Sequence, residues 1–86
     1  MFTTNKTQQT GVRPINEIAR EIEKEWKNVN YAARPYLDAM HSLVDKNSRY
    51  IADSATSIVA YFLSNATTWR GEAARRIKAE LNKIIK

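Results

Sequence analysis

Apolar residues recur at helical spacing in four stretches of the chain, and polar connections separate these stretches. In the first, Ile15, Ile18, Ile22 and Trp26 lie three or four residues apart, so their side chains form one stripe on a helix. The pattern predicts four helices: Pro14 to Lys27, Pro35 to Val44, Ser54 to Ser64 and Trp69 to Ile85. Short connections are typical of helical bundles, so we predict an all-α fold, a small four-helix domain.

Local signals indicate where the helices begin. Pro14 suits the first position of a helix, where its missing N–H costs nothing. Asp53 or Ser54 can cap the third helix, and Thr67 or Thr68 the fourth. We expect the first helix to cover a core that the third and fourth helices supply.

Two segments allow alternatives. Pro35 can open the second helix with Arg34 extended before it, or the helix begins near Asn30 and bends at the proline. The run from Ile58 to Leu63 contains residues that favour strands. An isolated strand is not viable and no second strand-like run is present to pair with it, so we predict a helix there.

Composition limits the organisation and the chemistry. The 86 residues make one domain: residues 13–86 form the helical domain, and residues 1–12, rich in Thr, Gln and Asn, are expected to be a flexible, disordered tail. The absence of cysteine excludes disulfides and thiolate metal sites. No apolar run approaches the roughly 18 residues of a membrane span, and no secretory signal opens the chain, so we expect a cytoplasmic protein.

Positive charge concentrates in the last helix. The formal net charge is +5, and the stretch from Arg70 to Lys86 carries six Lys and Arg residues against two Glu residues, a balance of +4. These cations can form a phosphate-binding face for nucleic acid, made of Arg75, Arg76, Lys78, Lys83 and Lys86. A solvated face favoured by the helix dipole explains them more simply, and Glu72 and Glu80 interrupt the stripe.

The segment Trp69-Arg70-Gly71-Glu72 opens the predicted fourth helix. Arg70 falls near the positive end of the helix dipole, where a cation is disfavoured. We therefore expect compensation from Asp53, Asp38, a helix-end carbonyl or an external anion. Trp69 can anchor a partner. The favoured interpretation is an internal brace, with Trp69 in the core, Gly71 allowing a close helix approach and Arg70 paired within the fold.

His41 is the only histidine, and helical spacing brings it near Asp38 and Asp45. One histidine with two carboxylates is below the ligand number of a zinc site. Asp38 and His41 could form an acid–base pair, but no Ser or Lys is placed as a nucleophile beside them. No phosphate-binding glycine loop or metalloprotease motif is present. We predict no enzyme activity, no catalytic residues, no cofactor and no metal.

Two stretches together resemble a family of short helical proteins of bacteriophages and prophages, known as a domain of unknown function. They are INEIAREIEKEWKNVNYAARPYLDAM and DSATSIVAYFLSNATTWRGEAARRIKAELNK, and their most specific pieces are PYLDAM, SIVAYFLSNA and WRGEAARRIKAEL. The connection before Asp53 often carries a glycine after the tyrosine in that family, whereas Ile51 follows Tyr50 here. The resemblance implies a phage-associated setting in a bacterial host and no catalytic residues.

These observations favour non-catalytic protein binding by a phage accessory protein that inhibits or modulates a host defence complex or another host or phage protein. A small core gains stability from a partner, so a homo-oligomer is a weaker form of the same idea. Tyr31, Tyr36, Tyr50 and Trp69 fall near helix ends, where they can be exposed. The expected contact surface is Trp69, Arg70, Arg75 and Arg76; small basic nucleic-acid-binding proteins are the alternative class.

Overall fold

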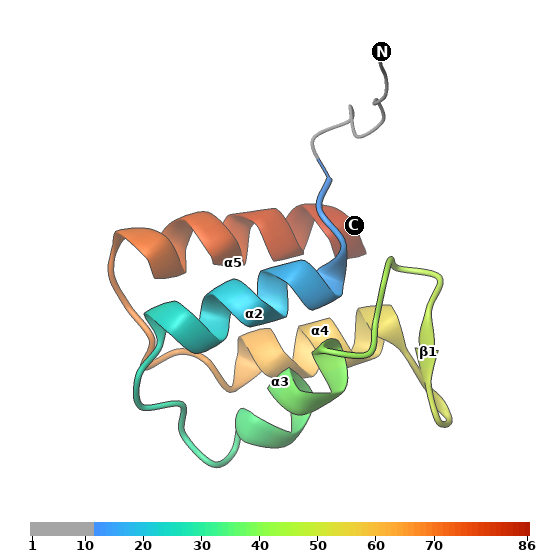
Figure 1. Ribbon diagram of the computed structural model, residues 1–86, viewed down its shortest axis with the longest axis horizontal. Coiled ribbons are helices and arrows are strands. Elements are labelled where there is room, and N and C mark those ends of the chain that lie inside the picture. The colour runs from blue at the N-terminus through green and yellow to red at the C-terminus, as the bar shows by residue number, and fades with distance from the viewer. Residues whose placement is uncertain (1–11) are drawn as a thin grey trace.

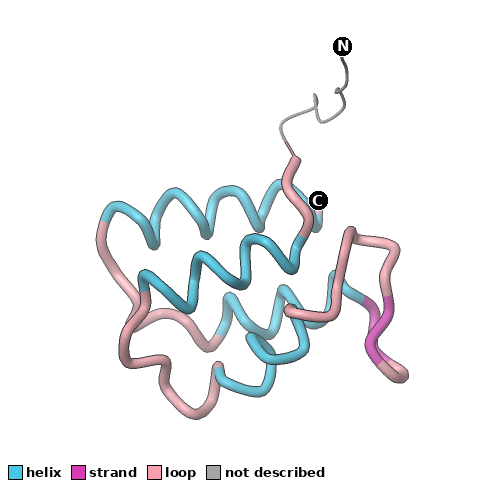
Figure 2. Tube along the Cα trace, in the orientation of Figure 1, coloured by secondary structure: helices cyan, strands magenta, loops and turns pink. Residues whose placement is uncertain are grey.

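The computed structural model describes residues 12–86, so the predicted tail lies outside the described residues except for Val12. Four helices and one small hairpin follow one another (Figures 1 and 2): α2 (Ile15–Glu25), α3 (Arg34–Met40), β1 (Arg49–Tyr50), β2 (Asp53–Ser54), α4 (Ala55–Ser64) and α5 (Glu72–Ile85). The prediction of a small, mostly helical domain is confirmed. The all-α prediction is wrong at the hairpin, because two-residue strands are too short to leave an alternating pattern in the sequence.

The helices close into a ring in which each one packs on two others. In Figure 1, α2 and α5 run side by side, with α4 and the short α3 beyond α2. Ile15, Ile18 and Ile22 of α2 are fully buried, so this helix supplies the core together with α4 and α5 and does not merely cover it. Within residues 12–86, no helix has the length and apolar character needed to cross a membrane.

Side chains and backbone groups near the helix starts bind the free N–H groups there. The carbonyl of Pro14, directly before α2, accepts the N–H groups of Glu17 and Ile18 at 3.0 and 3.2 Å. Ser54 caps α4 by accepting the N–H of Ser57 at 3.2 Å, which confirms one of its two predicted caps. Asn30 does the same ahead of α3, where its Oδ1 accepts the N–H of Ala33 at 2.8 Å.

The structure corrects both ends of the second predicted helix. Arg34 is the first residue of α3 and is helical, so Pro35 does not follow an extended residue. The proline is tolerated because its missing N–H falls within the first turn, where no helical hydrogen bond is lost. At the other end α3 stops at Met40, and Val44 lies four residues beyond it and is exposed.

The fourth helix begins three residues later in the chain than the predicted start at Trp69. Its first residue is Glu72, and the segment from Asn65 to Gly71 is a connection, so neither Thr67 nor Thr68 caps it. Gly71 directly precedes the helix with φ 114° and ψ 179°, a conformation that only glycine adopts readily. A Cβ added to Gly71 would meet nothing within 4 Å. Its backbone conformation, and not a close approach of helices, therefore requires the glycine.

The hairpin joins α3 to α4 and carries a strained residue at its tip. Arg49 pairs with Ser54 and Tyr50 with Asp53 in an antiparallel register, which leaves Ile51 and Ala52 as the turn. Ile51 has φ 57°, in the left-handed region that a β-branched residue disfavours, and its side chain is 88% exposed. Glycine at this position would be unstrained, because glycine adopts positive φ as readily as negative φ.

Replacing Ile51 by glycine is expected to raise the stability of the domain by up to about 1 kcal/mol. The left-handed conformation costs an L-residue about 1–2 kcal/mol, and the greater freedom of glycine in the unfolded chain offsets part of the gain. The measurement is the thermal unfolding midpoint, with Ala52→Gly as the control because Ala52 has no positive φ. A variant no more stable than this control would show that the turn carries no strain.

Candidate functional site

Three aromatic rings brace the junction of α2, α4 and the connection before α5. The rings of Trp26 and Trp69 stack at 5.4 Å with an interplanar angle of 8°, and the Phe62 ring meets Trp26 edge-on at 6.1 Å. Only 5% of Trp69 is exposed. The brace interpretation of Trp69 is confirmed. The expectation that Trp69 is exposed as a partner anchor is wrong, because its ring fills the space against Trp26.

An open pocket of about 480 Å³ lies against this brace. Three cations line it, namely Arg70, Arg75 and Lys78, and we call these three residues the basic corner. The remaining lining residues are Thr67, Trp69, Gly71 and Ala74, so no carboxylate is among them. The connection supplies Arg70, while Arg75 and Lys78 come from the first half of α5.

Lys78 is the innermost cation of the basic corner. Its Nζ donates a hydrogen bond to the Trp69 carbonyl at 2.6 Å and lies 5.9 Å from the centre of the indole ring. Partial burial lowers the pKa of Lys78, and the positive charge of Arg70 lowers it further. Lys78 therefore fastens the connection to α5 and carries a charge that its surroundings do not neutralise.

Arg70 and Arg75 are exposed and have no ion pair or hydrogen-bonding partner for their side chains among residues 12–86. Three of the four compensations expected for Arg70 do not form in this part of the chain. Asp38 bonds to Arg34 instead, and Arg70 contacts neither Asp53 nor a helix-end carbonyl. Arg70 lies in the connection and not on an apolar helix face, so exposure to solvent makes its charge tolerable.

Two other arginines, Arg76 of α5 and Arg13 ahead of α2, are neutralised within the fold. Arg76 pairs with Glu21 of α2 at 2.6 Å, and Arg13 holds Glu80 through two hydrogen bonds of 2.8 and 2.9 Å. Arg13 also reaches Glu21 at 2.8 Å. Hydrogen bonding to Arg76, and secondarily to Arg13, lowers the pKa of Glu21. The basic face predicted for α5 is therefore split, and Arg76 belongs to the contact between α2 and α5.

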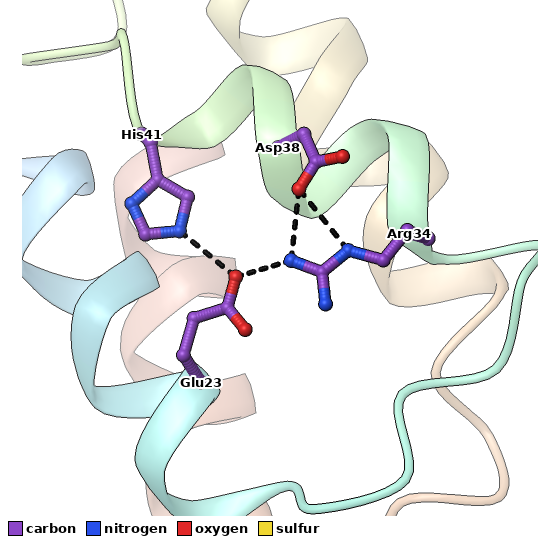
Figure 3. A network of polar contacts seen from close by, with 4 residues as sticks. All are labelled: Glu23, Arg34, Asp38 and His41. Atoms are coloured by element: carbon purple, nitrogen blue, oxygen red, sulfur yellow. Dashed lines mark hydrogen bonds and ion pairs between the residues drawn. The ribbon is translucent and has the colours of Figure 1, made fainter.

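Four polar residues connect α2 to α3 on the other side of the molecule (Figure 3). Glu23 of α2 accepts hydrogen bonds from Arg34 and from His41 Nε2, the latter at 3.0 Å. Arg34 also holds Asp38, with its Nε and a terminal nitrogen 3.1 and 2.8 Å from Oδ1. His41 thus pairs with Glu23 and not with Asp38 or Asp45. The sequence did not indicate this partner, because it lies 18 residues away and helical spacing relates only residues three or four apart.

The network has the features of a structural connection. Glu23, the only residue of the network on α2, is shared between a guanidinium and an imidazole. Within residues 12–86, no hydroxyl or amine side chain hydrogen-bonds to His41, and no group of three His, Asp or Glu side chains is arranged to hold a metal ion. Arg34 above all, and His41 secondarily, lower the pKa of Glu23.

Replacing Glu23 by glutamine is expected to destabilise the domain by about 1 kcal/mol at neutral pH, a modest amount because the side chains are partly exposed. The pKa of Glu23 is lower in the folded protein than its ordinary value of 4.5, so its contribution is present above pH 4.5 and is lost as the pH falls through the folded pKa. Urea unfolding across pH should therefore show the difference from wild type shrinking below pH 4.5.

Glu25→Gln is the matched control. It removes the same charge from α2, but Glu25 is exposed and has no partner among the described residues. Its stability should follow the wild type at every pH. A Glu23→Gln deficit that stays constant from neutral to acid pH would contradict the ionic role of Glu23.

The comparisons with known proteins add no relative: no protein-family model, no curated protein and no solved structure matches this chain.

Proposed function

We propose that this protein is a non-catalytic binding protein that docks on an acidic surface of a protein partner through the basic corner. One observation carries the proposal: Arg70, Arg75 and Lys78 surround an open pocket that no carboxylate lines. Arg70 and Arg75 are exposed and have no carboxylate partner among residues 12–86, so they are available to a partner protein, and charge complementarity guides such encounters. The resemblance to short phage and prophage proteins suggests an accessory role on a host or phage protein in a bacterial cell.

The proposed surface differs from the one expected from the sequence. Arg70 and Arg75 remain, whereas Trp69 is buried as a brace and Arg76 is paired with Glu21. Lys78 joins the surface as its innermost charge. Protein binding is favoured over nucleic-acid binding because Arg76 is paired with Glu21, which interrupts the row of cations along α5, whereas Arg70, Arg75 and Lys78 line one pocket.

The test compares two variants that make the same change of charge. Immobilised wild-type protein, Arg70→Glu/Arg75→Glu and Arg20→Glu/Lys46→Glu are exposed to bacterial host lysate, and retained proteins are identified by mass spectrometry. Arg20 and Lys46 are exposed and have no partner among the described residues, so they report the effect of net charge alone. A purified candidate partner should lose about tenfold or more in affinity with the first pair of changes only.

Two results would count against this function. The first is that no protein is retained by the wild type over the Arg70→Glu/Arg75→Glu variant. The second is that both pairs of changes weaken a purified partner equally, because this would make the attraction a matter of net charge. Circular dichroism and thermal unfolding of all three proteins establish that the fold is unchanged.

Nucleic-acid binding is the second candidate, since the chain carries a net charge of +5 and Arg75, Lys78, Lys83 and Lys86 of its last helix are not paired with a carboxylate in the described part of the chain. Under this function, duplex or single-stranded probes should be shifted at low salt, with affinity falling steeply as salt rises. Arg75→Glu/Lys83→Glu should abolish the shift. A protein that shifts no probe at low salt does not act in this way.

A further inference from the structure

We infer that the basic corner is a receptor for the side-chain carboxylate of an acidic peptide segment, with Arg70 and Arg75 as the residues that contact it. The inference rests on the proposed function and specifies the chemistry of the partner. Of the four compensations expected for Arg70, three do not form among the described residues, and the inference gives the fourth, an external anion, a chemical identity and a place.

The first argument comes from how the molecule treats its other arginines. Of the five other arginines, Arg13, Arg34 and Arg76 each meet a carboxylate of another part of the chain within 3 Å. Arg49 donates to the Ala52 carbonyl at 3.3 Å, and Arg20 stands alone without a partner among residues 12–86. Arg70 and Arg75 meet none among the described residues, although they share a pocket with a third cation. Like charges at short range repel, and the Arg70 charge is felt at Lys78. A bound anion would remove this repulsion.

The second argument comes from the chemistry of the pocket walls. An arginine guanidinium presents a planar fork of donors that matches the two oxygens of a carboxylate. Trp69 and Ala74 also line the pocket, but only 5% and 2% of them are exposed, so they offer a ligand little apolar surface. What the pocket offers such a side chain is therefore mainly the charge and the donor groups of the two arginines.

The third argument distinguishes a peptide from a nucleic acid. A nucleic acid places phosphates at regular intervals, and a binder needs a row of cations to follow them. Arg76 is engaged by Glu21, Glu72 stands on α5 beside Arg75 and Arg76, and Lys83 lies along the helix toward its other end. Three cations gather at one pocket without forming a row with the others, which suits a single acidic side chain of a peptide.

Lys78 has a different part in this site. Its half-buried Nζ donates to the Trp69 carbonyl, whereas the side chains of Arg70 and Arg75 are exposed and make no bond with the described residues. Its bond to Trp69 also fixes the connection that carries Arg70. We therefore treat Lys78 as a positioning residue and leave it unchanged in the test.

The experiment uses a short peptide of alternating glutamate and glycine as the probe and follows the ¹⁵N–¹H spectrum of the protein. The peptide is titrated to millimolar concentration at low salt. Shifts are expected at the backbone of Arg70, Gly71 and Arg75 and at the Trp69 indole N–H. Arg70→Gln/Arg75→Gln should weaken binding about tenfold, whereas Arg20→Gln/Lys46→Gln should leave it within about twofold.

Three other outcomes would overturn the inference. The same peptide with glutamine in place of glutamate could bind equally well, which would exclude recognition of a carboxylate. A single-stranded oligothymidylate could bind at the corner while the peptide does not, which would favour the nucleic-acid function. Finally, the peptide could fail to bind while a purified protein partner still depends on Arg70 and Arg75; the proposed function would then stand and the ligand chemistry would be wrong.

Discussion

The Trp26→Ala variant is expected to lose about 3–5 kcal/mol of stability, the usual cost of removing a large buried aromatic side chain. Trp26 is buried between the stacked ring of Trp69 and the edge of Phe62, so its loss leaves a cavity where α2, α4 and the connection to α5 meet. A domain of this length has about 4–13 kcal/mol of stability in all. The variant should therefore unfold at a much lower urea concentration than the wild type.

Urea unfolding followed by circular dichroism measures this effect. Tyr31→Ala is the control, because Tyr31 is also an aromatic residue but is 91% exposed, and its loss should change stability by no more than about 0.5 kcal/mol. The wild type should also show blue-shifted tryptophan emission, since both of its tryptophans are buried. A Trp26→Ala variant as stable as Tyr31→Ala would show that the stacked rings do not form the brace.

The Gly71→Ala variant is expected to lose about 1–3 kcal/mol, although its new methyl group would contact nothing. The reason is the backbone: φ 114° with ψ 179° is a region that L-residues with a Cβ adopt only under strain. Relief of this strain would require the connection to change its path ahead of α5. Arg70 and Trp69 would then move relative to Arg75 and Lys78, so the basic corner would change shape together with the loss of stability.

Thermal unfolding of Gly71→Ala against Thr67→Ala separates strain from loss of contacts. Thr67 lies in the same connection, is exposed and makes no side-chain bond with the described residues, so its replacement should be nearly neutral. If both variants unfold at the wild-type midpoint, the positive φ at Gly71 is not required for the fold.

Hydrophobic periodicity determined the existence of all four helices and most of their buried faces. Ile15, Ile18 and Ile22 are buried as one stripe of α2, and Ile77, Leu81 and Ile84 as one stripe of α5. Ser54 was one of two predicted caps of α4, because a side-chain oxygen directly before a helix can accept a free N–H of its first turn, although the same reasoning failed at Thr67 and Thr68. These features depend on neighbours three or four residues away, and the sequence displays such neighbours directly.

Backbone conformation was only partly accessible from the sequence. Gly71 was singled out as unusual, but close packing and a positive φ both explain a glycine, and only the structure distinguishes them. The hairpin was missed because its turn contains Ile51 and Ala52, without the Asn-Gly or Asp-Gly pair that marks a tight hairpin. Ile51 adopts a conformation against its own preference, which no local pattern predicts.

The candidate site depended on tertiary structure for a physical reason. The sequence by itself determined that the last helix is basic, that Trp69 adjoins Arg70 and that neither catalytic nor metal-binding motifs accompany them. It could not determine which cations are neutralised, because Glu21 meets Arg76 across 55 residues and Glu80 meets Arg13 across 67. The Coulomb energy of two side chains depends on their distance in space, and only folding sets that distance for residues far apart in the chain.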